Sequence, residues 1–238
     1  MAQGIQQPAF VLRKRSYQES SELVDFFSPE KGRISCVVKG AKRKRIGGTL
    51  AQRLQLFRPL LVRYHGRGSL KLLSDVEDLQ VPHALSNEAY YAAHYINELL
   101  LRILQEEESY PELFAQYAKL LAALSAGSSP RVTIRRFEWR VLQALGADPD
   151  LSSDAQGKAI DRNKCYHFVA DEGWYEAPQP GGSGVVQGVW LEAFAGHDPE
   201  AWASRTAREL LEHLLRPYVG KAPFKSRLLW QQQVQQQQ

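Results

Sequence analysis

The sequence predicts an α+β protein, in which a small antiparallel β-barrel is followed by an α-helical bundle with an irregular insertion. Short apolar runs separated by turn residues fill the first 80 residues, and long stretches without Pro or Gly follow. Residues 146–200 are broken repeatedly by Gly and Pro. The chain has 238 residues, 44% of them hydrophobic and 24% charged, which is typical of globular proteins. We expect two domains, at residues 1–80 and 81–238.

Five short strands are expected in the first domain, at residues 9–12, 23–27, 33–38, within 54–64, and at 70–76. The turn at residues 28–32 has Pro29 early and Gly32 at its close. Pro59 lies inside the fourth segment and indicates an edge strand or a bulge there. Five short strands with a basic face favour a barrel of the OB type, a fold much used for single-stranded nucleic acid. Periodicity alone leaves an SH3-like barrel open.

Helices are expected at residues 87–108, 113–124, 131–145 and 199–215, and short connections make the first three a bundle. Within the insertion at about 146–200, residues 165–169 are a candidate strand and residues 173–175 a candidate start of a hairpin. The tail from Gln231 is nearly all glutamine, and we expect it to be disordered.

The sequence gives no positive reason to expect an enzyme. It contains no phosphate-binding P-loop, no dinucleotide glycine fingerprint and no nucleophile elbow. Cys36 and Cys165 are the only cysteines, and no two of the six histidines have the i, i+4 spacing of a helical zinc site. We expect no signal peptide, because no cationic segment followed by an apolar core opens the sequence, and no stretch approaches the roughly 20 apolar residues of a membrane span. We therefore expect no catalytic residue, metal, cofactor or membrane contact, and a cytoplasmic location.

The basic residues are concentrated in the first third of the chain. Residues 1–80 contain 15 Lys or Arg and 7 Asp or Glu, a net charge of +8. Residues 81–238 contain 15 and 19, a net charge of −4. This segregation suggests a polyanion-binding module joined to a neutral or acidic one. The candidate phosphate-binding residues are Arg13, Lys14, Arg15, Lys39, Lys42, Arg43, Lys44, Arg45, Arg53, Arg58, Arg63 and Arg67.

Aromatic residues are interleaved with these cations, and they have two interpretations. Phe26, Phe27 and Phe57 are expected in the barrel core. Tyr17 and Tyr64 are either structural or free to stack on nucleic-acid bases.

A second candidate binding site lies on the predicted helix at 131–145. Its residues are Arg135, Arg136, Phe137 and Arg140. An arginine beside an apolar groove can bind a carboxylate while the groove takes a hydrophobic side chain. An ordinary helix face with Phe137 and Trp139 partly buried explains the same pattern.

Ten segments, in order along the chain, resemble the bacterial RecO recombination mediators. They are AFVL (9–12), YQESS (17–21), FSPEKGR (27–33), VKGAKR (38–43), LFRPLL (56–61), GRGSLK (66–71), YINELL (95–100), IRRFE (134–138), and PYVG (217–220) with FKSR (224–227). The resemblance implies an N-terminal OB-fold, a helical bundle and a zinc-finger-like insertion. It also implies binding of single- and double-stranded DNA and annealing of complementary strands, in a bacterial cytoplasm in association with the nucleoid.

The resemblance further implies three protein partners. These are RecR, the acidic C-terminal tail of single-stranded-DNA-binding protein, and indirectly RecA, which is loaded onto DNA. Arg135 is the expected carboxylate clamp for the tail. Many members carry two cysteine pairs in the insertion, whereas this chain has only Cys165 there, so we expect an insertion without zinc, held by packing. The alternative function is that of an RNA-binding or ribosome-associated OB protein. A hydrolase that uses the insertion is a third hypothesis, and the missing set of ligand side chains argues against it.

Overall fold

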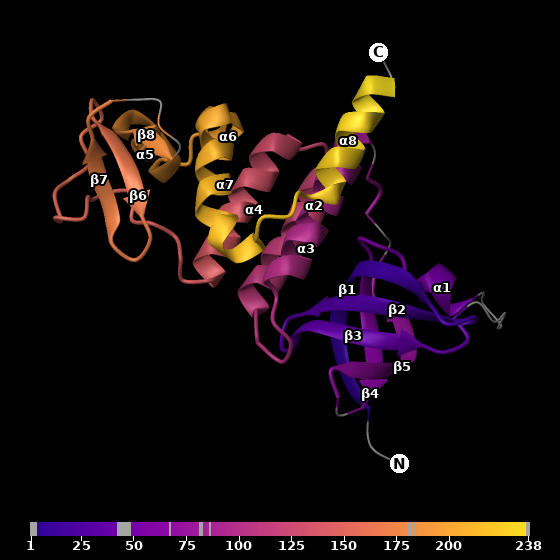
Figure 1. The fold of residues 1–238 in the computed structure, drawn as a ribbon. Coiled ribbons are helices and arrows are strands. Elements are labelled where there is room, and N and C mark those ends of the chain that lie inside the picture. Colours follow the sequence, from indigo (N-terminus) through magenta and orange to yellow (C-terminus); the bar gives the residue numbers. More distant parts are fainter. Residues whose placement is uncertain are drawn as a thin grey trace. The chain divides into compact units, whose positions relative to one another are not determined.

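A computed structural model describes residues 4–41, 49–66, 68–80, 83–85, 87–179, 182 and 184–236. The chain forms two compact units (Figure 1). The first comprises Met1–Gly127 with Pro223–Gln238, and the second comprises Ser128–Ala222. The boundary expected at residue 80 lies inside the first unit, and the helices expected as one bundle are divided between the two units.

The first unit contains a closed barrel. Its strands are β1 (Ile5–Tyr17), β2 (Ser21–Ser28), β3 (Gly32–Val38), β4 (Pro59–His65) and β5 (Leu70–Asp78), with the short helix α1 (Leu50–Arg53) between β3 and β4. The order is β1-β2-β3-β5-β4, and β3 and β5 are parallel whereas the other neighbours are antiparallel. This is the OB fold, so the predicted α+β class and five-stranded barrel are confirmed. Pro59 begins β4, where its missing N–H is tolerated.

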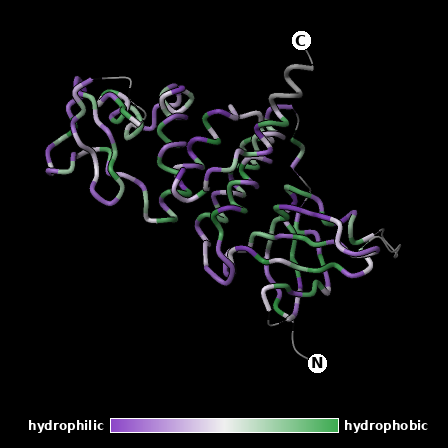
Figure 2. The backbone as a smooth tube through the Cα atoms, in the orientation of Figure 1, coloured by the Kyte–Doolittle hydropathy of each residue, from purple (hydrophilic) through white to green (hydrophobic). Residues whose placement is uncertain are grey.

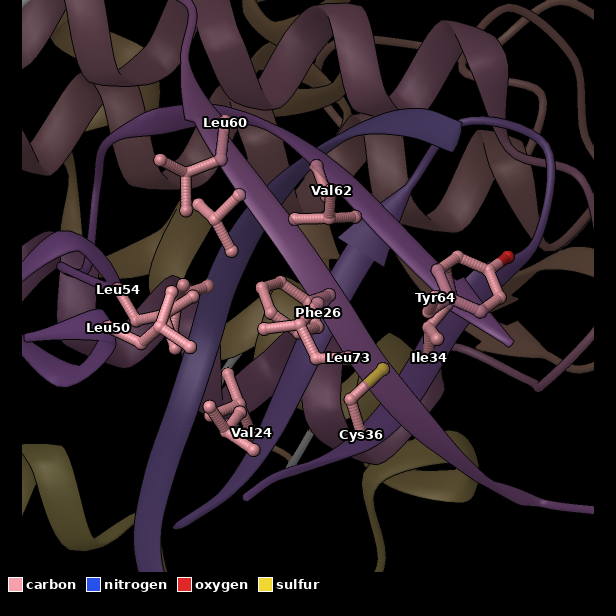
Figure 3. Close-up of a cluster of buried hydrophobic side chains, with 14 of the residues drawn as sticks. Val24, Phe26, Ile34, Cys36, Leu50, Leu54, Leu60, Val62, Tyr64 and Leu73 are labelled. Atoms are coloured by element: carbon pink, nitrogen blue, oxygen red, sulfur yellow. The ribbon is translucent and has the colours of Figure 1, made fainter. Parts of the chain in front are cut away.

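Alternating side chains fill the barrel interior (Figure 3). Along β3, buried and half-buried residues alternate strictly, as expected of a strand with one face toward a core. Figure 2 shows hydrophobic stretches in the barrel strands. Tyr64 is 1% exposed inside this core, so it cannot stack on bases and that interpretation was wrong. Burial raises the pKa of Cys36 to about 12 and that of Tyr64 to about 12, which leaves both side chains neutral and the thiol unreactive.

Two helices pack on the barrel, α2 (Asn87–Ile103) and α3 (Pro111–Ser125). Phe26 lies in the barrel interior as predicted, but neighbouring residues of a strand face opposite sides. Phe27 therefore points outward, and its ring lies 5.3 Å from that of Phe114 on α3. Phe57 likewise packs outside the barrel, 5.1 Å from the His94 ring on α2. The expectation that all three phenylalanines form the barrel core was thus correct for one.

A buried hydrogen-bond chain joins the same elements. Asn97 of α2 donates its amide N–H to the backbone oxygen of Leu12 at 3.1 Å and accepts the Tyr117 hydroxyl at 2.6 Å. Asn97 is 2% exposed and Tyr117 is fully buried, so neither side chain can rely on water for hydrogen bonds. The chain gives each of these buried polar groups a partner. Barrel, α2 and α3 are therefore linked by both apolar and polar contacts.

The connection after α2 pairs with the β2–β3 turn. Arg33 donates its backbone N–H to Gln105 at 3.0 Å, and Tyr110 donates to Pro29 at 2.7 Å. Gly32 has φ +56°, and a Cβ there would lie 2.5 Å from the Gln105 oxygen, so the contact requires glycine. These backbone bonds explain why α2 ends at Ile103 instead of continuing to residue 108.

Helix α8 (Lys225–Gln236) packs against α2 within the first unit (Figure 1). Glu98 of α2 accepts the backbone N–H groups of Lys225 and Ser226, at 3.0 and 2.9 Å, which caps the start of α8. The Arg102 guanidinium lies over the Phe224 ring, 3.9 Å from its centroid. The backbone is helical through Gln236, in the segment expected to be disordered. Glutamine is a good helix former, so a helix whose first turn is fixed can extend through the glutamine residues.

The second unit combines helices with a small sheet. Its elements are α4 (Pro130–Ala144), β6 (Cys165–Val169), β7 (Gly173–Ala177), β8 (Val185–Gln187), α5 (Gly188–Ala195), α6 (Pro199–Ala203) and α7 (Arg205–Val219). The sheet order is β7-β6-β8, and the predicted strand at 165–169 matches β6. The helix expected at 199–215 is interrupted at Ser204, which ends α6 and caps α7 by accepting the Ala207 N–H at 3.1 Å.

Candidate nucleic-acid interface

The strand register places the basic part of β1 on the outside of the barrel. Arg13 is opposite Asp25, and Arg15 is opposite Leu23; Asp25 and Leu23 alternate with the interior residues Val24 and Phe26. The pairing continues across β3 and β5. We call the resulting surface the outer barrel face; it comprises Arg13, Arg15, Tyr17, Leu23, Asp25, Ser35, Val37, Leu70 and Leu72.

The outer barrel face combines cations with exposed apolar and aromatic groups. Arg15 is exposed, and Tyr17 is 36% exposed at the end of β1. Leu70 is 42% exposed, and Lys39 is exposed directly after β3. Guanidinium and ammonium groups bind phosphates, and an exposed tyrosine ring can stack on a base. The surface therefore has both chemical components of a single-strand-binding site.

Arg13 is held by an internal carboxylate. Its Nε and Nη2 atoms lie 2.9 and 2.8 Å from Oδ2 of Asp25, and Ser35 Oγ donates to Oδ1 of Asp25 at 2.7 Å. The Asp25 residue is 2% exposed, whereas the Arg13 side chain is 47% exposed. Sequence reasoning missed Asp25, although an acidic residue within the apolar run LVDFF was a usable signal.

The remaining described candidates are distributed over the barrel. Lys14 lies opposite Val24 and donates to the Ala51 oxygen of α1 at 3.2 Å, so it is on the other side of β1 from Arg13. Arg53 ends α1 and is half-buried. Arg58 is ion-paired with Asp78 at 2.8 Å, and exposed Arg63 donates to Gln6 at 3.2 Å. Lys42, Arg43, Lys44, Arg45 and Arg67 lie outside the described residues.

Three further cations of the first unit form ion pairs with acidic residues of the α2–α3 connection. Lys31 and Lys71 both lie 3.0 Å from Glu107 carboxylate oxygens, and Arg33 lies 3.6 Å from Glu106. Hydrogen bonds from Lys31 and Lys71 lower the pKa of Glu107 and outweigh the opposing effect of its burial. Glu106 and Glu107 thus neutralise part of the basic charge of the barrel.

On α4, the four candidate partner-binding residues differ in accessibility. Arg135 is ion-paired with Glu138, and the two side chains are 12% and 0% exposed. Phe137 is 3% exposed and belongs to the interior. Arg136 and Arg140 are exposed, and they donate to the His197 oxygen at 3.1 Å and to Gln143 Oε1 at 2.7 Å.

The sheet of the second unit does not fit a zinc site. Cys165 is paired in register with Ala177 and Gln187, neither of which is a zinc ligand. In the part of the chain that the structure describes, no three His, Cys, Asp or Glu side chains are grouped to hold a metal. None of the helices within the described ranges has the length and apolar character needed to cross a membrane.

The fold defines an OB-barrel protein with appended helices, and comparisons with known proteins identify its family. A family model described as Recombination protein O N terminal matches residues 1–82, and one described as Recombination protein O C terminal matches residues 86–184. The chain belongs to the RecO family. It is accordingly a protein of DNA repair and recombination.

Curated relatives agree with this assignment over most of the chain. The DNA repair protein RecO of Pseudomonas paraeruginosa is 38% identical over 225 residues, 94% of either chain. That of Glaesserella parasuis is 37% identical over 228 residues, again 94% of either chain. That of Aliivibrio fischeri is 34% identical over 240 residues, covering 97% of this chain and 96% of its own.

Proposed function

We propose that this protein is a recombination mediator. It binds single- and double-stranded DNA, anneals complementary strands and, together with RecR, helps RecA load onto DNA coated by single-stranded-DNA-binding protein. The observation that carries the proposal is the outer barrel face, where Arg13 and Arg15 lie beside the exposed ring of Tyr17. Its setting is the cytoplasm of a bacterium, at the nucleoid.

DNA binding follows from the chemistry of this face. Arg13, Arg15 and Lys39 contact backbone phosphates, and bases stack on Tyr17 and lie against the half-buried Val37 and the exposed Leu70. Phosphate contacts carry no sequence information, so the affinity for DNA should not depend on the base sequence. Lys42, Arg43, Lys44 and Arg45 begin four residues after the end of β3 at Val38 and add further phosphate contacts, as do Arg53, Arg63 and Arg67.

Annealing requires no catalytic residue. A cationic surface reduces the repulsion between two strands and raises their effective concentration, which accelerates pairing. The protein therefore acts as a binding surface and not as an enzyme, and it needs no cofactor.

The second unit recruits the acidic C-terminal tail of single-stranded-DNA-binding protein through α4. Arg136 and Arg140 are exposed and lie one turn apart, so both can reach one carboxylate or two neighbouring ones. Arg135, originally expected as the clamp, is largely buried and paired with Glu138, and it supports the helix instead. We therefore assign the tail-binding charge to the exposed Arg136 and Arg140.

A fluorescence annealing assay tests the whole proposal. Complementary oligonucleotides coated with single-stranded-DNA-binding protein should anneal faster with this protein than without it. The acceleration should disappear when the coating protein lacks its acidic tail, whereas binding to bare oligonucleotides should persist. No acceleration, or acceleration with RNA strands only, would contradict a role in DNA recombination and favour the RNA-binding alternative.

A further inference from the structure

A buried carboxylate lies within a surface that attracts polyanions. Asp25 is 2% exposed in β2, between the interior residues Val24 and Phe26, and its side chain is on the outer barrel face. Desolvation of a carboxylate costs free energy, and its negative charge repels phosphates. Both effects oppose its presence there, so a compensating role is required.

The contacts of Asp25 fix both of its oxygens. Oδ2 receives Nε and Nη2 of Arg13 at 2.9 and 2.8 Å, and Oδ1 receives the Ser35 hydroxyl at 2.7 Å. The three residues occupy one row across β1, β2 and β3. The guanidinium is thus oriented from two of its nitrogens by a carboxylate that a third strand holds in place.

We propose that Asp25 is a positioning residue for DNA binding, which orients Arg13 so that its outward N–H groups meet a phosphate of a bound single strand. The inference rests on the proposed function, because it assigns a role within the same outer barrel face. A free arginine loses much rotamer entropy on binding, whereas one already ordered loses less. A phosphate oxygen accepts from the donors that face away from Asp25, so both anions can contact Arg13 together.

Electrostatics alone predicts the opposite outcome of removing the carboxylate. Asp25→Asn deletes one negative charge from the cationic face, which on Coulombic grounds strengthens DNA binding. Positioning predicts weaker binding, because the neutral amide holds the guanidinium less firmly. The sign of the change therefore separates the two explanations.

The experiment measures anisotropy of a labelled single-stranded oligonucleotide at several salt concentrations, using the full chain. Asp25→Asn should weaken binding about threefold to tenfold, the worth of one ordering hydrogen bond. The slope of log affinity against log salt should stay unchanged because Arg13 keeps its charge. Arg13→Lys, which retains charge but lacks the planar fork, should behave similarly.

Glu77→Gln supplies the matched control, since Glu77 is an exposed carboxylate of β5 opposite Leu61. It removes the same charge without touching Arg13 and should leave affinity equal or slightly higher. Thermal unfolding confirms that each variant is folded. Asp25→Asn binding as tightly as Glu77→Gln would overturn the positioning role while leaving DNA binding intact. Failure of the unmodified protein to bind the oligonucleotide would instead overturn the proposed function, and the inference with it.

Discussion

Arg135 of α4 is ion-paired with Glu138 on the next turn of the same helix, and the Glu138 side chain is fully buried. A charge pair that is out of water depends strongly on both members. Loss of Arg135 therefore lowers the stability of the second unit, so a test of the α4 arginines has to measure stability as well as binding.

Arg135→Ala should lower the free energy of unfolding by about 1–3 kcal/mol, because Glu138 loses a charged hydrogen-bond partner while buried. Arg136→Ala and Arg140→Ala should change it by less than about 0.5 kcal/mol, since both side chains are exposed. Urea denaturation measures the first effect, and anisotropy with an acidic peptide ending in Phe measures binding. We expect the exposed pair to weaken peptide binding more than Arg135→Ala does; the reverse order would return the clamp to Arg135.

Replacing Lys42, Arg43, Lys44 and Arg45 together with Ala should weaken DNA binding and flatten its salt dependence. The slope should fall by up to about 3, since each neutralised phosphate contributes roughly 0.7 for a single strand. Lys31→Ala is the control. Lys31 is already ion-paired with Glu107, so this substitution should leave the salt slope unchanged. Unaltered affinity of the quadruple variant at low salt would remove this segment from the interface.

Tyr17→Ala should reduce affinity for single strands about fivefold, because stacking of one base on an aromatic ring is worth about 1 kcal/mol or more. Tyr17→Phe keeps the ring and should retain most of the affinity. Quenching of tyrosine fluorescence on DNA binding provides an independent measurement. If Phe weakens binding as much as Ala, the hydroxyl and not the ring makes the contact.

Glu98 makes the docking of α8 dependent on pH. Burial raises the pKa of Glu98, but hydrogen bonds from Ser226, Lys225 and Arg102 outweigh it, and the net pKa lies below the usual 4.5. Because the folded pKa is the lower one, the stabilisation is complete above about pH 4.5 and is lost as the pH falls through the folded value.

Glu98→Gln should therefore lower the free energy of unfolding by about 1–2 kcal/mol at neutral pH and by much less in acid. Urea titrations at about pH 7 and about pH 3 measure the difference. Glu88→Gln, in the exposed first turn of the same helix, should show no such pH-dependent loss. An equal loss at both pH values would mean that the charge of Glu98 does not hold α8.

The strands and long helices were predictable because their apolar spacing is local information, as β3 and β6 show. Short or interrupted elements were not: α1 has four residues, and Ser204 divides a helical pattern only because its side chain caps the following turn. The candidate site is proposed from the sequence as a set of cations on the first domain, and it stays a prediction. The sequence does not show which barrel cations are neutralised by ion pairs, because their acidic partners are distant in the chain. Glu107 pairs with Lys71, and Asp78 pairs with Arg58.

Placement of α8 within the first unit has a consequence for biosynthesis. Residues 128–222 leave the ribosome and can fold while the first unit still lacks Pro223–Gln238. Until then Tyr91 and Tyr95 of α2 have no Trp230 or Phe224 rings against them. The apolar strip on α2 therefore stays uncovered until residues 223–238 have been translated. A ribosome stalled in the second unit leaves an incomplete first unit exposed to proteases and chaperones.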